Sequence, residues 1–375
     1  MDGIWSGRDS KQKKQSRFEI FSNLLLKVIS VMAMLALLLT LIAPHITPKG
    51  GVILPTFALT APIVYIVNIM LALCWLSLWR WQYAIAMSIL LLFGMGRVSR
   101  FVKVSSTKSY EEEIHKGAIK MMTYNVRWFN GIGWDSKYKD IVEFFEQVSP
   151  DILTTQEFSY NKKLFEEYAP NMSKYNVVKD EGLSIITRYP IIANGNTLNK
   201  DNELQCRAIW VDIVVGVDTL RIFNNHLQST DIKESDNRYL TSSKIIRDSN
   251  RNRVVKGVLK RYAESCVTRA KQVDEISKVI AESPYKVIVC GDFNDTPQSY
   301  AYNTLADGLR DAFSECGDGY SYTYLGFFNM LRIDYILTDR DITPLSYKVD
   351  HELKSSDHLP VISHLRIEKT NPQKR

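Results

Sequence analysis

Three long apolar runs dominate the first quarter of the chain. The first, residues 24–43, has about the 20 apolar residues that cross ~30 Å of hydrocarbon, and only Lys27 interrupts it. The second extends from Val52 to Trp79, and the third, from Trp81 to Val98, follows directly after Arg80. The pattern predicts an N-terminal all-α membrane anchor at residues 1–98. Its three transmembrane helices are expected at about 24–43, 53–79 and 81–98.

The distribution of basic residues predicts the orientation of this anchor. Six Lys/Arg residues lie in the N-terminal tail and at Arg80, whereas four flank the opposite ends of the helices. Because cytoplasmic segments favour Lys and Arg, we expect a multi-pass protein of the cell membrane with its N-terminus inside. Three spans then place the rest of the chain outside the cytoplasm, and a different number of spans remains the alternative. A cleaved signal peptide is a rival explanation of the first run, but that run exceeds the usual apolar length of about 7–15 residues.

Beyond a polar linker at residues 99–117, the pattern changes to short β-rich runs separated by turns and helices. Runs such as AIKMMTYNV and YKVIVCGD are rich in Val, Ile, Thr and Tyr, which favour strands. The segment YKDIVEFFEQV instead places its apolar residues on one face of an amphipathic helix. Many strands with helices outside them predict one α/β domain at residues 118–367, a four-layer α/β/β/α sandwich of two packed sheets. Residues 368–375 are expected to form a tail.

The net charge of +6 comes from the N-terminal part of the chain. Residues 1–104 hold 11 Lys/Arg and 3 Asp/Glu, whereas the remainder holds 36 and 38. A duplex-binding domain usually carries a positive field of its own, so the charge gives no support to one here. The five cysteines form no CxxC pair, which excludes a disulfide scaffold and a Cys-rich zinc site.

Six short segments place polar residues of metal-ligand or acid–base type within or directly after strand-like runs. Each segment has an ordinary explanation on its own. The GDFND segment suits a turn, and SSDHLP suits a helix cap or a pre-proline turn. The segments together, in their order along the chain, outweigh these explanations. The residues concerned are Asn125, Glu157, His226, Asp292, Asn294, Asp334, Asp357 and His358.

The ordered set N…QE…H…GDFN…D…SDH resembles the endonuclease/exonuclease/phosphatase superfamily, the metal-dependent phosphoesterases related to pancreatic deoxyribonuclease. The resemblance covers about residues 118–367, and GLSIITRYPI at 182–191 adds a strand that is usual in the family. It implies hydrolysis by in-line attack of water, with a metal ion as Lewis acid. Ser159 is a departure, because some nucleases of the family carry an Arg there, and its absence weakens the case for a duplex nuclease.

The resemblance also implies roles for individual residues. His358 would be the general base for the attacking water, and Asp334 would hold its imidazole in the right tautomer. His226 would donate to a phosphate oxygen as charge builds in the transition state. Asp292 and Asn294 complete the expected catalytic set.

The expected metal ligands all offer oxygen. Glu157 is the principal candidate, with Asn125 and Asp357 as the other expected ligands. Together with Asp292 and Asn294, these two supply further oxygens to metal, water or phosphate. Carboxylates and amides without Cys suit a hard cation, so we expect Mg²⁺ or Mn²⁺ as the cofactor.

These observations predict a membrane-anchored, Mg²⁺-dependent phosphoesterase that hydrolyses a phosphodiester or phosphomonoester, such as a phospholipid or an inositol-type phosphate. The alternatives are a metal-dependent endonuclease or exonuclease and a non-catalytic, membrane-tethered binding module. The expected partners are the lipid bilayer and a phosphate ester, nucleic acid is less favoured, and no protein partner is indicated. Residues 229–271 hold 11 Lys/Arg against 5 Asp/Glu. This basic stretch is either a solvated helix face or a surface for anionic headgroups.

Overall fold

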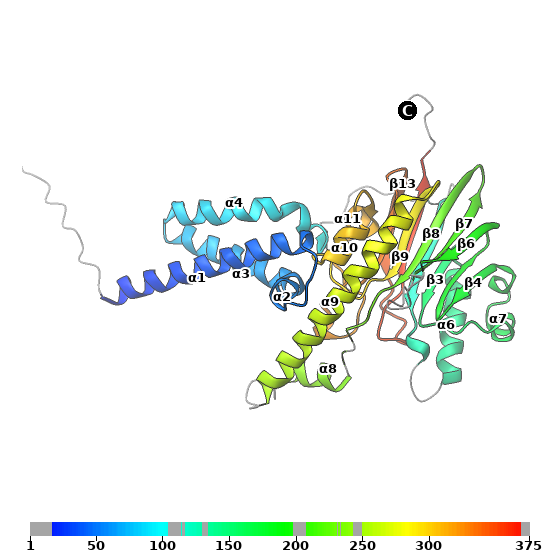
Figure 1. Cartoon of the computed structure of the whole chain (residues 1–375), viewed down its shortest axis with the longest axis horizontal. Helices are drawn as coiled ribbons and strands as arrows, with labels where there is room; N and C mark the ends of the chain where they lie inside the picture. The colour runs from blue at the N-terminus through cyan, green and yellow to red at the C-terminus, as the bar shows by residue number, and fades with distance from the viewer. Residues whose placement is uncertain are drawn as a thin grey trace, which may run out of the picture.

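The chain has an N-terminal helical region and a larger α/β region, as the computed structural model in Figure 1 shows. The structure describes residues 17–103, 114, 117–129, 134–197, 208–230, 232, 234–242 and 250–368. Three predicted features therefore lie wholly or largely outside the described residues: the basic tail at 1–16, most of the linker at 99–117 and the C-terminal tail after residue 368.

The helical region contains two helices that are long and apolar enough to cross a membrane, at Arg17–His45 and Trp81–Val98. The segment predicted as one span at 53–79 instead holds two helices with a bend of 74° between them, which makes a third span if the pair is counted as one. Pro62 occupies the first turn of the second helix, where its missing N–H breaks no hydrogen bond. We call the bend, residues 59–63, the elbow. The helices are α1 (Arg17–Ile42), η1 (Ala43–His45), α2 (Ile53–Leu59), α3 (Ala61–Ser77) and α4 (Trp81–Val98).

Two buried polar contacts fix α3 against α1. The Asn68 amide donates to the carbonyl of Ala33 at 2.9 Å, and the Trp75 indole donates to Ser30 Oγ at 2.8 Å. Between apolar helices such hydrogen bonds specify which faces pack together.

The α/β region consists of two six-stranded sheets. The first has the order β13-β14-β2-β3-β5-β4 and the second β10-β12-β9-β8-β7-β6. The strands of the first are β2 (Ile119–Asn125), β3 (Ile152–Gln156), β4 (Asn176–Asp180), β5 (Leu183–Thr187), β13 (Ile342–Val349) and β14 (Val361–Ile367). The strands of the second are β6 (Ile191–Asn196), β7 (Ala208–Val215), β8 (Asp218–His226), β9 (Lys286–Asp292), β10 (Arg310–Asp311) and β12 (Asp334–Thr338).

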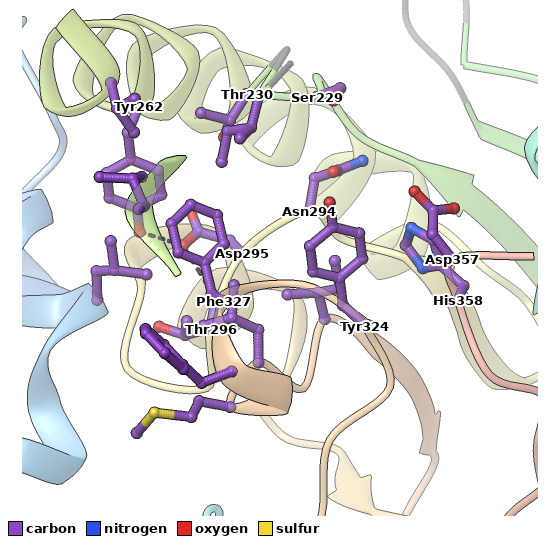
Figure 2. Close-up of a pocket in the computed structure, with 18 of the residues that line it drawn as sticks. Ser229, Thr230, Tyr262, Asn294, Asp295, Thr296, Tyr324, Phe327, Asp357 and His358 are labelled. Atoms are coloured by element: carbon purple, nitrogen blue, oxygen red, sulfur yellow. Dashed lines mark hydrogen bonds between the residues drawn. The ribbon is translucent and has the colours of Figure 1, made fainter. Parts of the chain in front are cut away.

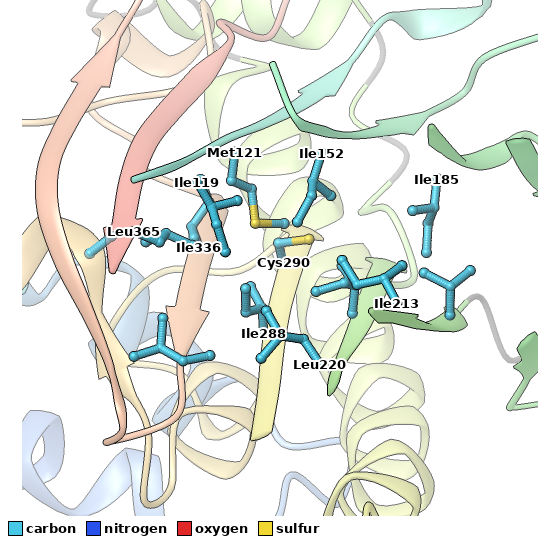
Figure 3. Packing of buried hydrophobic residues seen from close by; sticks show 14 of the residues in the cluster. Ile119, Met121, Ile152, Ile185, Ile213, Leu220, Ile288, Cys290, Ile336 and Leu365 are labelled. Carbon is cyan, nitrogen blue, oxygen red and sulfur yellow. The ribbon is translucent and has the colours of Figure 1, made fainter. Parts of the chain in front are cut away.

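Apolar side chains from the two sheets meet in one core. Figure 3 shows Met121 and Ile152 of the first sheet facing Ile288 and Cys290 of the second, and all four are fully buried. Helices α6 and α7 cover the outer face of the first sheet, and α9 and α10 cover that of the second. These layers confirm the predicted four-layer α/β/β/α fold. The helices are α6 (Trp134–Val148), α7 (Lys162–Tyr168), α8 (Glu234–Leu240), α9 (Arg251–Ala281), α10 (Tyr300–Leu305) and α11 (Ala312–Cys316), with short turns η2 (Arg127–Phe129), η3 (Met172–Lys174) and η5 (Phe327–Asn329).

The helical region is attached to the α/β region through the chain that leaves α4. Residues 102–103 of the predicted linker form a short strand, β1 (Val102–Lys103), which pairs with β11 (Gly319–Tyr320). The Arg332 guanidinium donates to the carbonyl of Arg100 at 2.7 Å, and Lys103 Nζ donates to the carbonyl of Ser314 at 2.5 Å. The two regions therefore share polar contacts beyond the covalent connection.

The predicted basic stretch has a mixed character in the structure. Lys256 and Lys260 are exposed on α9, but Arg261 pairs with Asp236, and Arg269 is fully buried. Residues 231, 233 and 243–249 of the stretch lie outside the described residues. Its exposed charge is therefore smaller than the sequence count suggests.

Candidate active site

Four of the predicted site residues lie at the carboxyl ends of two parallel strand pairs. Asn125 ends β2 and Glu157 directly follows β3, while His226 ends β8 and lies opposite Asp292 at the end of β9. Because parallel neighbours end at the same edge, each sheet presents its polar residues at one edge. The sandwich brings these two edges together, since the Asn125 amide donates to Asp292 Oδ2 at 2.9 Å across the sheets.

Asp334 and His358 reach the same edge from antiparallel strands. Asp334 begins β12 and lies opposite Asp292, and His358 lies three residues before β14. His358 Nδ1 is 2.9 Å from Asp334 Oδ2, and its Nε2 is 3.8 Å from Asp292 Oδ2. The imidazole therefore lies between two buried carboxylates.

Asp292 is the centre of the cluster. Its Oδ2 accepts from Asn125 and, at 3.1 Å, from the Asn294 amide, and it lies 3.8 Å from His226 Nε2. His226 Nε2 is also 3.5 Å from Glu157 Oε1. The structure thus brings seven of the eight predicted residues into one connected group.

Asp357, the eighth residue, lies at the rim of this group. Its Oδ2 pairs with Arg127 Nη1 at 3.1 Å, and both side chains face the same cavity as His358. Ser356 connects this segment to the centre, because its hydroxyl donates to the carbonyl of Asn125 at 2.8 Å.

The backbone around the cluster adopts unusual conformations. Glu157 and Asn294 have φ values of 53° and 51°, in the left-handed region that costs energy for residues other than glycine. Gly291 has φ of 116°, and a Cβ there would collide with the carbonyl oxygen of Asn225 on β8. The glycine of the GDFN segment therefore lets β9 approach β8 closely and places the Asp292 carboxylate at the centre.

The pKa values of the two central titrating groups, Asp292 and His358, are both raised, but for different reasons. Burial raises the pKa of Asp292 to about 6, although the neighbouring His358 opposes the shift. Burial alone would lower the pKa of His358, but the Asp334 and Asp292 carboxylates outweigh it and raise this pKa to about 10. The cluster thus concentrates negative charge in a buried place, which a cation stabilises.

The donor set fits a hard divalent cation. Among the described residues, Asp292, Asp334 and His358 form the group whose potential ligand atoms all lie within 4.8 Å of one another. The carboxylate of Glu157 lies beside this group and adds oxygen ligands, while the Asn125 amide nitrogen donates to both Glu157 and Asp292 and holds the two carboxylates together. Oxygen-rich sets of this kind suit Mg²⁺ or Mn²⁺.

Two residues near the site carry functional groups that the sequence pattern did not single out. Arg127 has a side chain 42% exposed and offers a cation beside the cluster. The ring of Tyr324 contacts the ring of His358 edge to face at 5.3 Å between centroids. The only signal for Arg127 was its place two residues after Asn125, and Tyr324 had none, because an aromatic residue in a loop is usually a packing residue.

The cluster opens into a cavity of about 540 Å³. Figure 2 shows Asp357, His358 and Tyr324 at one end of it, with Phe327 and Tyr262 toward the other. Apolar side chains from the elbow, from α9 and from the segment around η5 also line the cavity. The lining therefore joins the polar catalytic cluster to apolar side chains of three other segments, with the hydroxyl groups of Thr230 and Thr296 among them.

Comparison with known proteins gave two matches to family models. One, described as the Endonuclease/Exonuclease/phosphatase family, matches residues 122–358. The other, described as a domain of unknown function, matches residues 23–101. No curated protein matched the chain.

Several solved structures are similar to the chain. A humanized TDP2 of D. rerio is 15% identical with a TM-score of 0.49, over 66% of this chain and 98% of that one. An endonuclease/exonuclease/phosphatase of Bacteroides vulgatus is 18% identical with a TM-score of 0.47, over 67% of this chain and all of that one. A mannosyl-6-phosphatase of Bacteroides thetaiotaomicron gives the same four values.

Proposed function

The chain belongs to the endonuclease/exonuclease/phosphatase family, and on that premise we propose that it hydrolyses a phosphoester at a membrane by attack of water on phosphorus. It is a metal-dependent phosphoric ester hydrolase, as members of this family are. The observation that carries the proposal is the convergence on Asp292 of acid–base and amide side chains from both sheets.

The proposed base is His358. Asp334 accepts the hydrogen bond from Nδ1, so that in the neutral form of His358 the Nε2 atom, on the side that faces Asp292, takes a proton from water. His226 lies across Asp292 and donates to a phosphate oxygen as charge develops there. Asn125 and Asn294 hold the Asp292 carboxylate in place through their amides.

The proposed metal-holding residues are Asp292, Glu157 and Asn125, with Mg²⁺ as the proposed cation. When bound, a divalent cation supplies Lewis-acid stabilisation of a phosphoryl oxygen. Arg127, at the rim, offers a second positive charge to the substrate phosphate, provided that it leaves Asp357.

We favour a phospholipid or inositol-type phosphate over nucleic acid as the substrate. Two helices, or three with the bent pair, are apolar enough to span a membrane, which supports a multi-pass anchor at residues 1–98 and a catalytic domain at 118–367. The positive-inside pattern supports a catalytic domain outside the cytoplasm.

A panel of substrates tests this function. The full-length chain in nanodiscs is offered a p-nitrophenyl phosphodiester, a phospholipid, an inositol phosphate and a single-stranded oligonucleotide, with Mg²⁺ or with EDTA. We expect metal-dependent turnover of the diester and the phospholipid, lost in Glu157→Gln and retained in the exposed control Glu167→Gln. Turnover of the oligonucleotide alone would favour the nuclease alternative, and turnover of nothing would favour a binding module.

A further inference from the structure

The cavity connects the catalytic cluster with the membrane helices. Its lining includes Glu157, Asp292 and His358 of the cluster together with Leu59 and Ile63 of the elbow. Resting on the proposed function, we propose that the elbow is one wall of an alkyl-chain subsite. The substrate is then a lipid phosphoester, whose chain lies between the elbow and the segment 327–330 while its phosphate reaches Asp292.

The elbow is held in a fixed position relative to the catalytic cluster. Thr296 Oγ1 donates to the carbonyl of Ala58 in the last turn of α2 at 3.4 Å. Gln298 donates to the carbonyl of Thr40 at the end of α1 at 2.8 Å, and both its side chain and the Thr40 side chain are fully buried. Since Thr296 lies four residues after Asp292, a short segment links the catalytic centre directly to the membrane helices.

A buried ion pair stiffens this linking segment. Asp295 accepts from Arg269 Nε at 2.9 Å and from the Tyr262 hydroxyl at 2.7 Å, and all three side chains are nearly or completely buried. These bonds connect the segment to α9, whose Leu259 lines the cavity. Buried hydrogen bonds therefore connect the elbow, α9 and the catalytic loop.

The segment 327–330, which also lines the cavity, shows the strain and exposure of a ligand-binding surface. Phe327, Phe328 and Asn329 have consecutive φ values of 47°, 61° and 56°. Three successive residues other than glycine in the left-handed region are costly, and such strain gathers at ligand-binding segments. Phe328 is 66% exposed and Met330 39% exposed at the cavity wall. Covering exposed apolar surface of this kind with an alkyl chain lowers the free energy.

The lining favours an alkyl chain over a nucleic acid. Arg127 is the one Lys or Arg side chain among the described residues that line the cavity. A groove for single-stranded nucleic acid combines aromatic stacking with a run of positive charge along the backbone. Aliphatic Leu59, Ile63 and Leu259 offer no stacking face, and Leu59 and Ile63 belong to the bent helix pair that is apolar enough to cross a bilayer if it is counted as one span.

A chain-length series tests the subsite. The full-length chain in nanodiscs hydrolyses p-nitrophenyl alkyl phosphodiesters with alkyl groups from methyl to decyl, each below its micellar concentration. For wild type we expect kcat/KM to rise about two- to fourfold per methylene until the cavity is filled. Because longer esters also partition into the bilayer, the decisive quantity is the change in the decyl-to-methyl ratio on substitution.

The substitutions are Ile63→Ser, Phe328→Ser and their combination. The controls are Ile66→Ser on α3, 60% exposed but outside the cavity lining, and Val217→Ser at the β7–β8 turn. We expect the decyl-to-methyl ratio to fall at least tenfold in the double variant and to stay at the wild-type value in both controls. Phe328 is on an exposed loop, so the single Phe328→Ser variant remains informative if the substitution in the elbow disturbs the helices.

Two results would overturn the subsite. One is a double variant whose decyl-to-methyl ratio equals that of wild type, while wild type hydrolyses the methyl ester. The chain would then be a phosphoesterase without an alkyl-chain subsite at the elbow. The other is an oligonucleotide cleaved faster than the decyl ester and slowed by Phe328→Ser, which would assign the aromatic side chain to base stacking. Failure of wild type to hydrolyse any ester would instead refute the proposed function itself.

Discussion

Replacing Asp334 by Asn removes the charge that orients the proposed base while keeping the size of the side chain. Asp334 Oδ1 and Oδ2 lie 3.2 and 2.9 Å from His358 Nδ1, and both residues are buried. The backbone is held separately, because the amides of Ile333 and Asp334 both donate to Thr323 Oγ1. Asp334→Asn should therefore fold normally. We expect kcat to fall by about 10²–10⁴, the usual contribution of a general base, because the amide no longer enforces the tautomer with a free Nε2.

The same substitution makes a second, independent prediction about pH. The Asp334 carboxylate is the largest of the influences that raise the pKa of His358, which burial alone would lower. Its removal should lower this pKa, so the acid limb of kcat/KM should move to lower pH even as the rate falls. The assay is the pH–rate profile of the methyl p-nitrophenyl diester at saturating metal, with the exposed Asp341→Asn as control. A kcat within about threefold of wild type, or an acid limb that stays in place, would refute the role of the pair.

Four further predictions concern the metal, the histidines, the topology and the basic surface. EDTA should abolish turnover, and Mg²⁺ or Mn²⁺ should restore it; full activity in EDTA would contradict the metal assignment. Glu157→Gln should weaken metal binding, measured by calorimetry, without altering the circular dichroism spectrum. His226→Ala and His358→Ala should each lower kcat by about 10²–10⁴, and the double variant by less than the product, unless the two act in separate steps. A reporter at the C-terminus should be active only if it works outside the cytoplasm, and a cytoplasmic signal would reverse the topology. Neutralising Lys256 and Lys260 should slow hydrolysis in anionic vesicles but not in neutral ones. Salt should remove this difference, because it screens exposed charges beyond ~8 Å. If the variant and wild type have equal rates in both kinds of vesicle, the stretch is an ordinary helix face.

The catalytic region could be predicted from the sequence because its signal is local. Each strand is an apolar run, and the polar residue that ends it, such as Asn125 or Asp292, stands out against that run. Parallel pairing then brings those ends to one edge without any further information. The core could be predicted in the same way, because strands with alternating or continuous apolar residues bury them by packing one sheet against another.

The elbow and its docking could not be predicted. The run from Val52 to Trp79 is apolar throughout, and Pro62 suits a first helical turn as well as a mild kink, so the pattern does not locate a bend of 74°. The helical region docks through the carbonyls of Thr40 and Ala58, and a backbone acceptor leaves no trace in the sequence. The joining of an apolar wall to the catalytic end of the cavity was therefore visible only in three dimensions.

The central claim, attack of water on phosphorus at the Asp292 cluster, is tested most directly by isotope incorporation. The full-length chain in nanodiscs turns over the decyl p-nitrophenyl diester in water enriched in ¹⁸O, with and without Mg²⁺, and ³¹P NMR follows the phosphate product. The account predicts one ¹⁸O in the phosphate product of each turnover, only when metal is present, and no detectable product with His358→Ala on the wild-type time scale. Product phosphate without ¹⁸O, or equal incorporation in the presence of EDTA, would contradict it.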